Sequence, residues 1–241
     1  MRVKKGILFI FIIVLFFTLL SLIFLGKSIF MVKNVKITKD FEIDKEKLLN
    51  YLEVYPIRSI FNYDTKLMEE KLSKHYYLKE YRVSKIYPNT LEIKILMREP
   101  LGKIVGKDSG LYNIDKSGVI YQDIGINRES IPLIILEENS NVKNGIKIGG
   151  KYEDFLDRLT FIKDKRYDLF LLISQIEVLN HNIYGLDYVI SFKTLSNSIY
   201  LKNKLDVDSI REGLSCIKYL EEKNDYGKIL LYTNNAFKVV L

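Results

Sequence analysis

The chain has 241 residues, 48% of them hydrophobic, and its 37 Lys and Arg against 30 Asp and Glu give a formal charge of +7. Basic residues alternate with acids rather than forming a dense block, so the composition does not favour a nucleic-acid-binding protein. A single cysteine excludes both an internal disulfide and a thiolate-rich metal site.

The first predicted element is a membrane-spanning helix. Residues 7–25 are apolar except for Thr18 and Ser21, and a helix of that length is about 28 Å long, which matches a hydrocarbon core of about 30 Å. No small-residue cleavage pattern follows, so we expect an uncleaved span over 7–26 behind a cytoplasmic head of residues 1–6. Positive residues flank the span almost equally. Because long C-terminal parts translocate largely regardless of charge, we expect the rest of the chain outside the cytoplasm.

The next part of the chain predicts the order β-α-α-β-β. A strand over 32–38 precedes two short helices whose N-caps are Asp44 and Asp64. Two strands follow, over 79–87 and 90–98, and in the second one Leu91, Ile93, Ile95 and Met97 alternate well with polar residues. We expect the core of this domain to contain Leu67, Leu72, Leu91, Ile93 and Ile95.

The remainder of the chain also mixes strands with helices, so the predicted fold class is α+β with a mainly antiparallel sheet in a second domain. Helices are expected over 152–166 and from Asp206 or Asp208 onward, while residues 168–180 fit a helix or a strand equally well. Strands are expected near 102–107, 110–114, 119–122, 131–136, 186–193, 198–204, 228–233 and 236–241.

Several of these segments, taken in order, resemble the FtsQ/DivIB family of bacterial cell division proteins. Tyr87 to Ile93, followed by Arg98-Glu99-Pro100, is similar to the closing hairpin of that family's POTRA domain. Leu111 to Val119 resembles the "I-D-x-x-G-x-V" hairpin that opens the family's second domain. Further matching segments are 32–38, 60–64 and 131–133. The resemblance implies a POTRA domain over 27–100 and an FtsQ/DivIB-type second domain over 101–241.

The chain departs from the family pattern at four places, one of which is Tyr77-Leu78-Lys79 in place of the P-W-V before the hairpin. Thr38 stands where the first strand usually ends in glycine, and Met97 replaces the Glu of the usual Glu-Arg-x-Pro. Near the C-terminus, residues 229–232 keep only the Leu and the Tyr of the family's D-L-R-Y. The last departure weakens the transfer of the family's partner contacts to this segment.

No pattern in the sequence indicates an enzyme. The two histidines, His75 and His181, have no partner at metal-ligand spacing, and neither nucleophile nor dinucleotide motifs occur. We therefore expect no catalytic residue, no cofactor, no metal and no small-molecule substrate.

The resemblance implies a non-catalytic, single-pass protein of the cytoplasmic membrane that acts at the division septum. Its implied partners are FtsL-like and FtsB/DivIC-like coiled-coil membrane proteins, with septal peptidoglycan synthase components as further partners, and its implied role is to help control septal peptidoglycan synthesis. The alternative is a POTRA-bearing module for protein translocation or envelope assembly, which would require several POTRA units or a long barrel.

A strand at a sheet edge exposes unpaired backbone groups to which a partner can add, and the terminal hairpin is the best such candidate. The opposing interpretation is that its apolar residues fill the core of the second domain. A second candidate surface lies at the end of the first domain. The candidate partner-binding residues are Leu214, Tyr232, Phe237, Lys238, Val239, Arg98 and Glu99.

Overall fold

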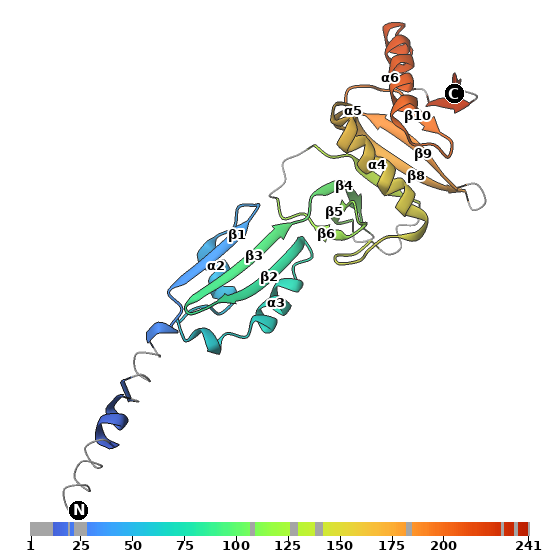
Figure 1. Ribbon diagram of the computed structural model, residues 1–241. Helices are drawn as coiled ribbons and strands as arrows, with labels where there is room; N and C mark the ends of the chain where they lie inside the picture. Colours follow the sequence, from blue (N-terminus) through green and yellow to red (C-terminus); the bar gives the residue numbers. More distant parts are fainter. Residues whose placement is uncertain are drawn as a thin grey trace, which may run out of the picture. The chain divides into compact units, whose positions relative to one another are not determined.

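The computed structural model divides the chain into two compact units, Met1–Met97 and Arg98–Leu241, whose elements are drawn in Figure 1. For the two C-terminal strands, over 229–233 and 236–240, the backbone alone is described. The structure describes residues 12–18, 20–21, 28–106, 109–125, 130–137, 142–181, 185–227, 229–233 and 236–240.

Only part of the predicted span lies among the described residues. Residues 12–18 are helical, and no helix in the described part of the chain has both the length and the apolar character needed to cross a membrane. The head over 1–6 and most of the span over 7–26 lie outside the described residues, so both stay predictions.

The first unit has the predicted β-α-α-β-β order. Its sheet has the strand order β1-β3-β2, in which β1 runs parallel to the central β3 and β2 runs antiparallel to it. The elements are β1 (Asn34–Lys39), α2 (Lys45–Tyr51), the 3-10 turn η1 (Ile60–Asn62), α3 (Thr65–Ser73), β2 (Leu78–Ile86) and β3 (Thr90–Met97).

Local sequence explains where these short helices begin. The Asp44 carboxylate accepts hydrogen bonds from the N–H groups of Glu46 and Lys47, and Asp64 does the same for the two residues at the start of α3. Helices of 7 and 9 residues are too short to be stable alone, so their apolar faces must be held by the sheet. Leu91, Ile93 and Ile95 of β3 are fully buried beneath them.

One residue of the predicted core is wrong. Leu67 is 49% exposed, whereas Met68 and Leu72 of the same helix are buried. Residues four apart share a helix face, so Met68 and Leu72 together face the sheet and Leu67 turns about 100° away from them. The other four predicted core residues are buried as expected.

The second unit contains a mixed sheet with the strand order β12-β11-β10-β9-β8-β7-β4-β5-β6. Most neighbouring strands pair antiparallel, but β4·β7, β7·β8 and β10·β11 are parallel. Two of the parallel pairs are connected through helices, as parallel neighbours require. The elements are β4 (Pro100–Val105), β5 (Leu111–Asp115), β6 (Ile120–Gln122), β7 (Leu133–Leu136), η3 (Gly150–Tyr152), α4 (Glu153–Lys165), α5 (Tyr167–Leu172), β8 (Ile173–His181), β9 (Gly185–Phe192), β10 (Ser198–Leu201), α6 (Val207–Glu222), β11 (Ile229–Thr233) and β12 (Ala236–Val240).

The segment over 168–180, which periodicity left undecided, forms both kinds of structure. Its first part is α5, which packs against α4, and its second part is β8, which pairs with β7 on one side and β9 on the other. Both parts contribute buried residues to one core, among them Phe170 and Ile176. An apolar run does not encode where the helix ends and the strand begins, because both elements bury it.

Candidate partner-binding site

Strand β12 forms one edge of the nine-stranded sheet. It pairs antiparallel with β11, from Ile229 opposite Val240 to Thr233 opposite Ala236, and no other described strand pairs with it. In this register Tyr232 lies opposite Phe237, while Lys238 and Val239 lie opposite Leu231 and Leu230. The outer edge of β12 therefore offers backbone N–H and C=O groups to an added strand.

Helix α6 supports this edge from within the unit. It connects the parallel strands β10 and β11 and packs against both. Leu214, which the sequence analysis named as a partner-binding candidate, is only 6% exposed and belongs to the hydrophobic core. Its side chain therefore holds α6 on the sheet rather than presenting a surface for docking.

Polar contacts fix both ends of α6 and hence the approach to β11. At its start, the Asp206 carboxylate accepts the Ser209 N–H at 2.9 Å. Burial raises the pKa of Asp206, but the hydrogen bonds from Ser209 and the Lys204 ammonium outweigh it and hold the pKa below its usual value. At the other end, the fully buried Asn197 donates to the Asp225 carbonyl at 3.0 Å.

The other candidate surface, Arg98 and Glu99, lies within the second unit rather than on the first domain. The Arg98 guanidinium is 2.7 Å from the carboxylate of the buried Asp115, and the Glu99 carboxylate is 2.6 Å from the Lys163 ammonium. Lys163 also donates to the Pro100 carbonyl. These ion pairs fasten the first residues of the unit to β5 and α4, so they position β4.

Asp115 belongs to the "I-D-x-x-G-x-V" segment that the sequence analysis used only as a family marker. Its carboxylate accepts the N–H groups of Ser117 and Val119, each at 2.9 Å, and so closes the turn between β5 and β6. Gly118 in that turn has a φ of +79°, and a Cβ there would lie 2.1 Å from the Ile148 carbonyl oxygen. An acid followed three residues later by glycine is the signal that indicates such a turn.

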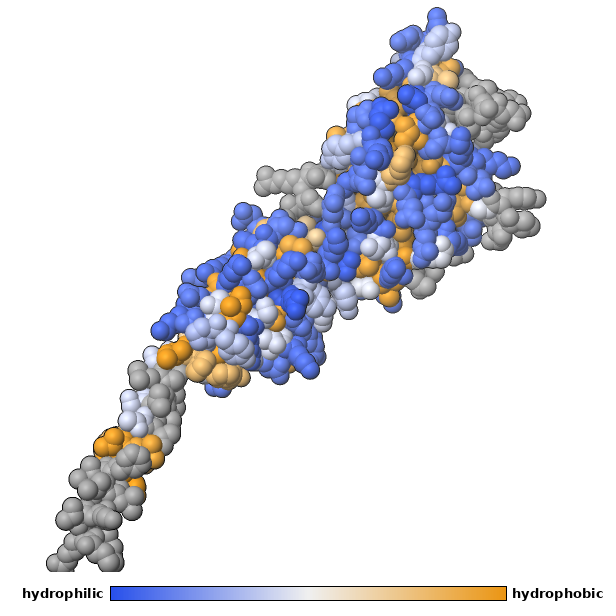
Figure 2. Space-filling model, viewed as in Figure 1, coloured by the Kyte–Doolittle hydropathy of each residue, from blue (hydrophilic) through white to orange (hydrophobic). Residues whose placement is uncertain are grey.

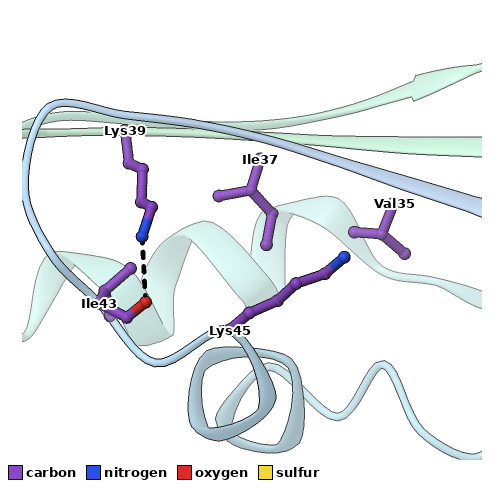
Figure 3. Close-up of a pocket in the computed structure, with 5 residues that line it drawn as sticks. All are labelled: Val35, Ile37, Lys39, Ile43 and Lys45. Atoms are coloured by element: carbon purple, nitrogen blue, oxygen red, sulfur yellow. Dashed lines mark hydrogen bonds between the residues drawn. The ribbon is translucent and has the colours of Figure 1, made fainter.

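The sheet of the first unit has β1 and β2 as its two edge strands, and lysines lie along the β1 edge. Val35 and Ile37 point from β1 toward α2, and Lys45 extends along the hollow beneath them (Figure 3). At the end of this hollow, the Lys39 ammonium donates to the Ile43 carbonyl at 3.1 Å. Lysines on and beside a short strand are typical of edges that must not pair, so β12 is a better docking candidate than β1.

Other reactive groups form no site in the described residues. No three His, Cys, Asp or Glu side chains there lie close enough to hold a metal ion. His75 lies between the rings of Tyr51 and Tyr77, and burial lowers its pKa. Burial also raises the pKa of the half-buried Cys216 thiol, which makes it a poorer nucleophile.

A family model described as "POTRA domain, FtsQ-type" matches residues 30–96. Residues 30–96 of the first unit form an FtsQ-type POTRA domain. This match supports the resemblance to the FtsQ/DivIB family over residues 30–96, and it ends one residue before Met97, where the first compact unit closes. No curated protein matches the chain.

The POTRA domain contains the segments on which the first half of the resemblance rests. The hairpin of β2 and β3 turns at Pro88 and Asn89, and the strand over 32–38 corresponds to β1 beside the central strand. Arg98 and Glu99 follow the matched residues, which agrees with their ion pairs inside the second unit.

Proposed function

We propose that this protein is a single-pass, non-catalytic cell division protein that docks a coiled-coil pair of the FtsL and FtsB/DivIC type and helps to control septal peptidoglycan synthesis. The FtsQ-type POTRA domain supports membership of a division family. The observation that carries the docking proposal is the place of β12 at the edge of its sheet, where β11 is its one partner among the described strands.

Backbone pairing explains how docking would tolerate the diverged C-terminal segment. Each added main-chain hydrogen bond contributes about 0.5–1.5 kcal/mol and does not depend on the side chain. A coiled-coil protein meets this edge only through an extended segment, so we propose that the partner contributes a short strand next to its coiled coil. Tyr232 and Phe237, which lie opposite each other in the hairpin, would add side-chain contacts of secondary importance.

The test uses two prolines at neighbouring positions of β12. N–H groups of an edge strand alternate between the paired side and the outer side, so one of Lys238 and Val239 donates toward β11 and the other points outward. Lys238→Pro and Val239→Pro, each in the full chain, should therefore differ. The variant that loses the outward donor should lose copurification with the coiled-coil pair from membranes while its thermal unfolding stays the same.

Deletion of 236–241 should abolish copurification, and Tyr232→Ala should weaken it less. Val239→Ala, which keeps the backbone donor, is the matched control for Val239→Pro. Full-strength capture of the partner by the deletion variant would contradict docking at β12, and the segment around Arg98 and Glu99 would then be the next candidate.

We also propose that the span over 7–26 anchors the chain in the cytoplasmic membrane, with its N-terminus inside. Protease added to intact spheroplasts should then digest the residues that follow Lys27, and the undigested protein should begin at or next to Met1. Protection of the POTRA domain from protease would contradict this orientation.

A further inference from the structure

Exposed apolar side chains gather at the end of the POTRA domain where residues 28–31 enter it. Figure 2 shows orange and pale orange atoms at this end of the domain. Six large apolar residues from three segments of the chain are 45–58% exposed there, and we call them the entry patch: Ile29, Tyr55, Ile57, Phe61, Ile86 and Tyr87.

The entry patch is one preformed surface rather than scattered residues. Backbone hydrogen bonds tie its segments together, from the Ile60 N–H to the Phe30 carbonyl at 2.8 Å and from the Lys33 N–H to the Asn89 carbonyl at 2.9 Å. The Phe61 ring lies between two others, 5.0 Å from Phe30 and 5.6 Å from Tyr87. Contiguous exposed apolar surface of this kind marks an interaction site.

The charged residues inside the patch segments are cations, and the acids that flank segment 55–61 are engaged elsewhere: Glu53 pairs with Lys71 and Asp64 caps α3. Segments 28–33, 55–61 and 86–89 contain Lys33 and Arg58 and no Asp or Glu. Both cations are exposed, and the Arg58 guanidinium lies 5.0 Å from the centre of the Tyr63 ring. Exposed aromatic rings combined with exposed cations suit the boundary between anionic lipid headgroups and acyl chains.

The chain places the patch within reach of that boundary. Ile29 follows Leu25, the last residue of the predicted apolar run, by four positions. Four residues extend over at most about 14 Å, and the headgroup region on each side of the hydrocarbon core is about 5–8 Å thick. At least the nearest part of the patch therefore lies close to the membrane surface if the span is embedded.

We propose that the entry patch rests on the outer surface of the cytoplasmic membrane, with the Phe61 and Tyr87 rings at headgroup depth and Lys33 and Arg58 among anionic lipid phosphates. This proposal rests on the span of the proposed function. It gives the POTRA domain a second attachment to the membrane, which restricts the tilt of the domain about its anchor.

The sequence contains no Trp, so a single introduced Trp reports its own surroundings. The test reconstitutes full-length Phe61→Trp into vesicles of phosphatidylcholine and phosphatidylglycerol whose lipids carry bromine near the top of the acyl chains. Bromine should quench the Trp emission. Tyr87→Trp is a second reporter in case the first substitution disturbs folding.

The matched control is Tyr76→Trp. Tyr76 is 44% exposed and precedes the start of β2, whereas Ile86 and Tyr87 lie at its other end. The two ends of this strand are about 26 Å apart. Brominated lipid should therefore leave the emission of Tyr76→Trp unchanged.

Flotation of the vesicles separates the two proposals. If the protein floats with the vesicles and both patch reporters escape quenching, the anchor stands and the membrane contact is wrong. If the protein does not float, the proposed anchor is wrong, and the contact with it. A blue shift without quenching would show that a second protein molecule covers the patch, which also overturns the proposal.

Charge gives a second readout. A cation at an anionic surface shifts the ratio of docked to undocked domain by about fivefold, so Lys33→Gln should reduce quenching in vesicles rich in phosphatidylglycerol. Lys79→Gln, at the far end of β2, should not. Equal quenching in Lys33→Gln and the parent reporter would contradict the role of anionic lipid.

Discussion

Both units of this protein bury apolar side chains, but they differ in whether they also bury polar ones. The described core of the POTRA domain consists of apolar residues and Tyr63. All of the buried polar residues in the described part of the chain lie in the second unit: Asn113, Asp115, Lys163, Asp187, Asn197 and Ser209. The comparison teaches that the POTRA domain is held by an apolar pattern, whereas the second unit also depends on specific polar partners.

The largest effect is expected from Asp115→Ala. This change removes the buried carboxylate that lies 2.7 Å from the Arg98 guanidinium and that closes the turn at Gly118, which should cost the second unit about 3–5 kcal/mol. Hydrogen exchange reports each unit separately. It should become faster in the second unit and stay unchanged in the POTRA domain. Glu80→Ala removes the exposed pair with Lys94 and should cost at most about 1 kcal/mol. An equal cost for the two variants would break the comparison.

Within the POTRA domain, burial alone should decide the cost of a substitution. Ile93→Ala removes a fully buried side chain of the central strand and should cost about 2–5 kcal/mol. Leu67→Ala, on the exposed face of α3, should cost within about 0.5 kcal/mol. Chemical denaturation of both variants measures the difference. A larger loss in Leu67→Ala would show that α3 presents its other face to the sheet.

Tyr200→Phe tests a polar contact in the second unit. The Tyr200 hydroxyl donates to the buried Asp187 carboxylate at 2.5 Å, and its loss should cost about 1–3 kcal/mol. Burial, together with this hydrogen bond, raises the pKa of Tyr200 to about 12. Its contribution is therefore complete below pH 10 and is lost as the pH rises toward 12. The Phe variant should lose this part of the alkaline pH dependence, and an unchanged profile would contradict the assignment.

The smallest effect concerns His75. Burial lowers its pKa below the model-compound value of 6.5, so the folded POTRA domain favours the neutral ring. The contribution of His75 to stability is present above pH 6.5 and falls as the pH drops through its lowered pKa. Thermal unfolding between pH 7 and 5 should show a shallower decline in His75→Phe, which keeps a ring beside Tyr51 and Tyr77. Identical slopes would show that His75 is equally solvated in both states.

The sequence predicts more of the POTRA domain than of the second unit. The two aspartate caps, the hairpin at Pro88 and the alternation of β3 are local signals, and each appears where expected. The predicted burial of Leu67 was wrong because Leu67 and Met68 are neighbouring apolar residues, and the period of so short a helix does not decide which of them faces the sheet. In the second unit the element bounds follow the predictions closely, but the sheet order and its parallel pairs arise from contacts far apart in the chain.

The candidate site shows the same division. Sequence alone determined that the chain has an apolar N-terminal run, a POTRA pattern and a C-terminal pair of strands, because each depends on neighbouring residues. Only the tertiary structure decided that β12 lies at an edge and that Leu214 is buried. It also decided that Arg98 and Glu99 form ion pairs with residues of the second unit. Edges, burial and ion pairs depend on which distant segments meet, and local periodicity does not encode this.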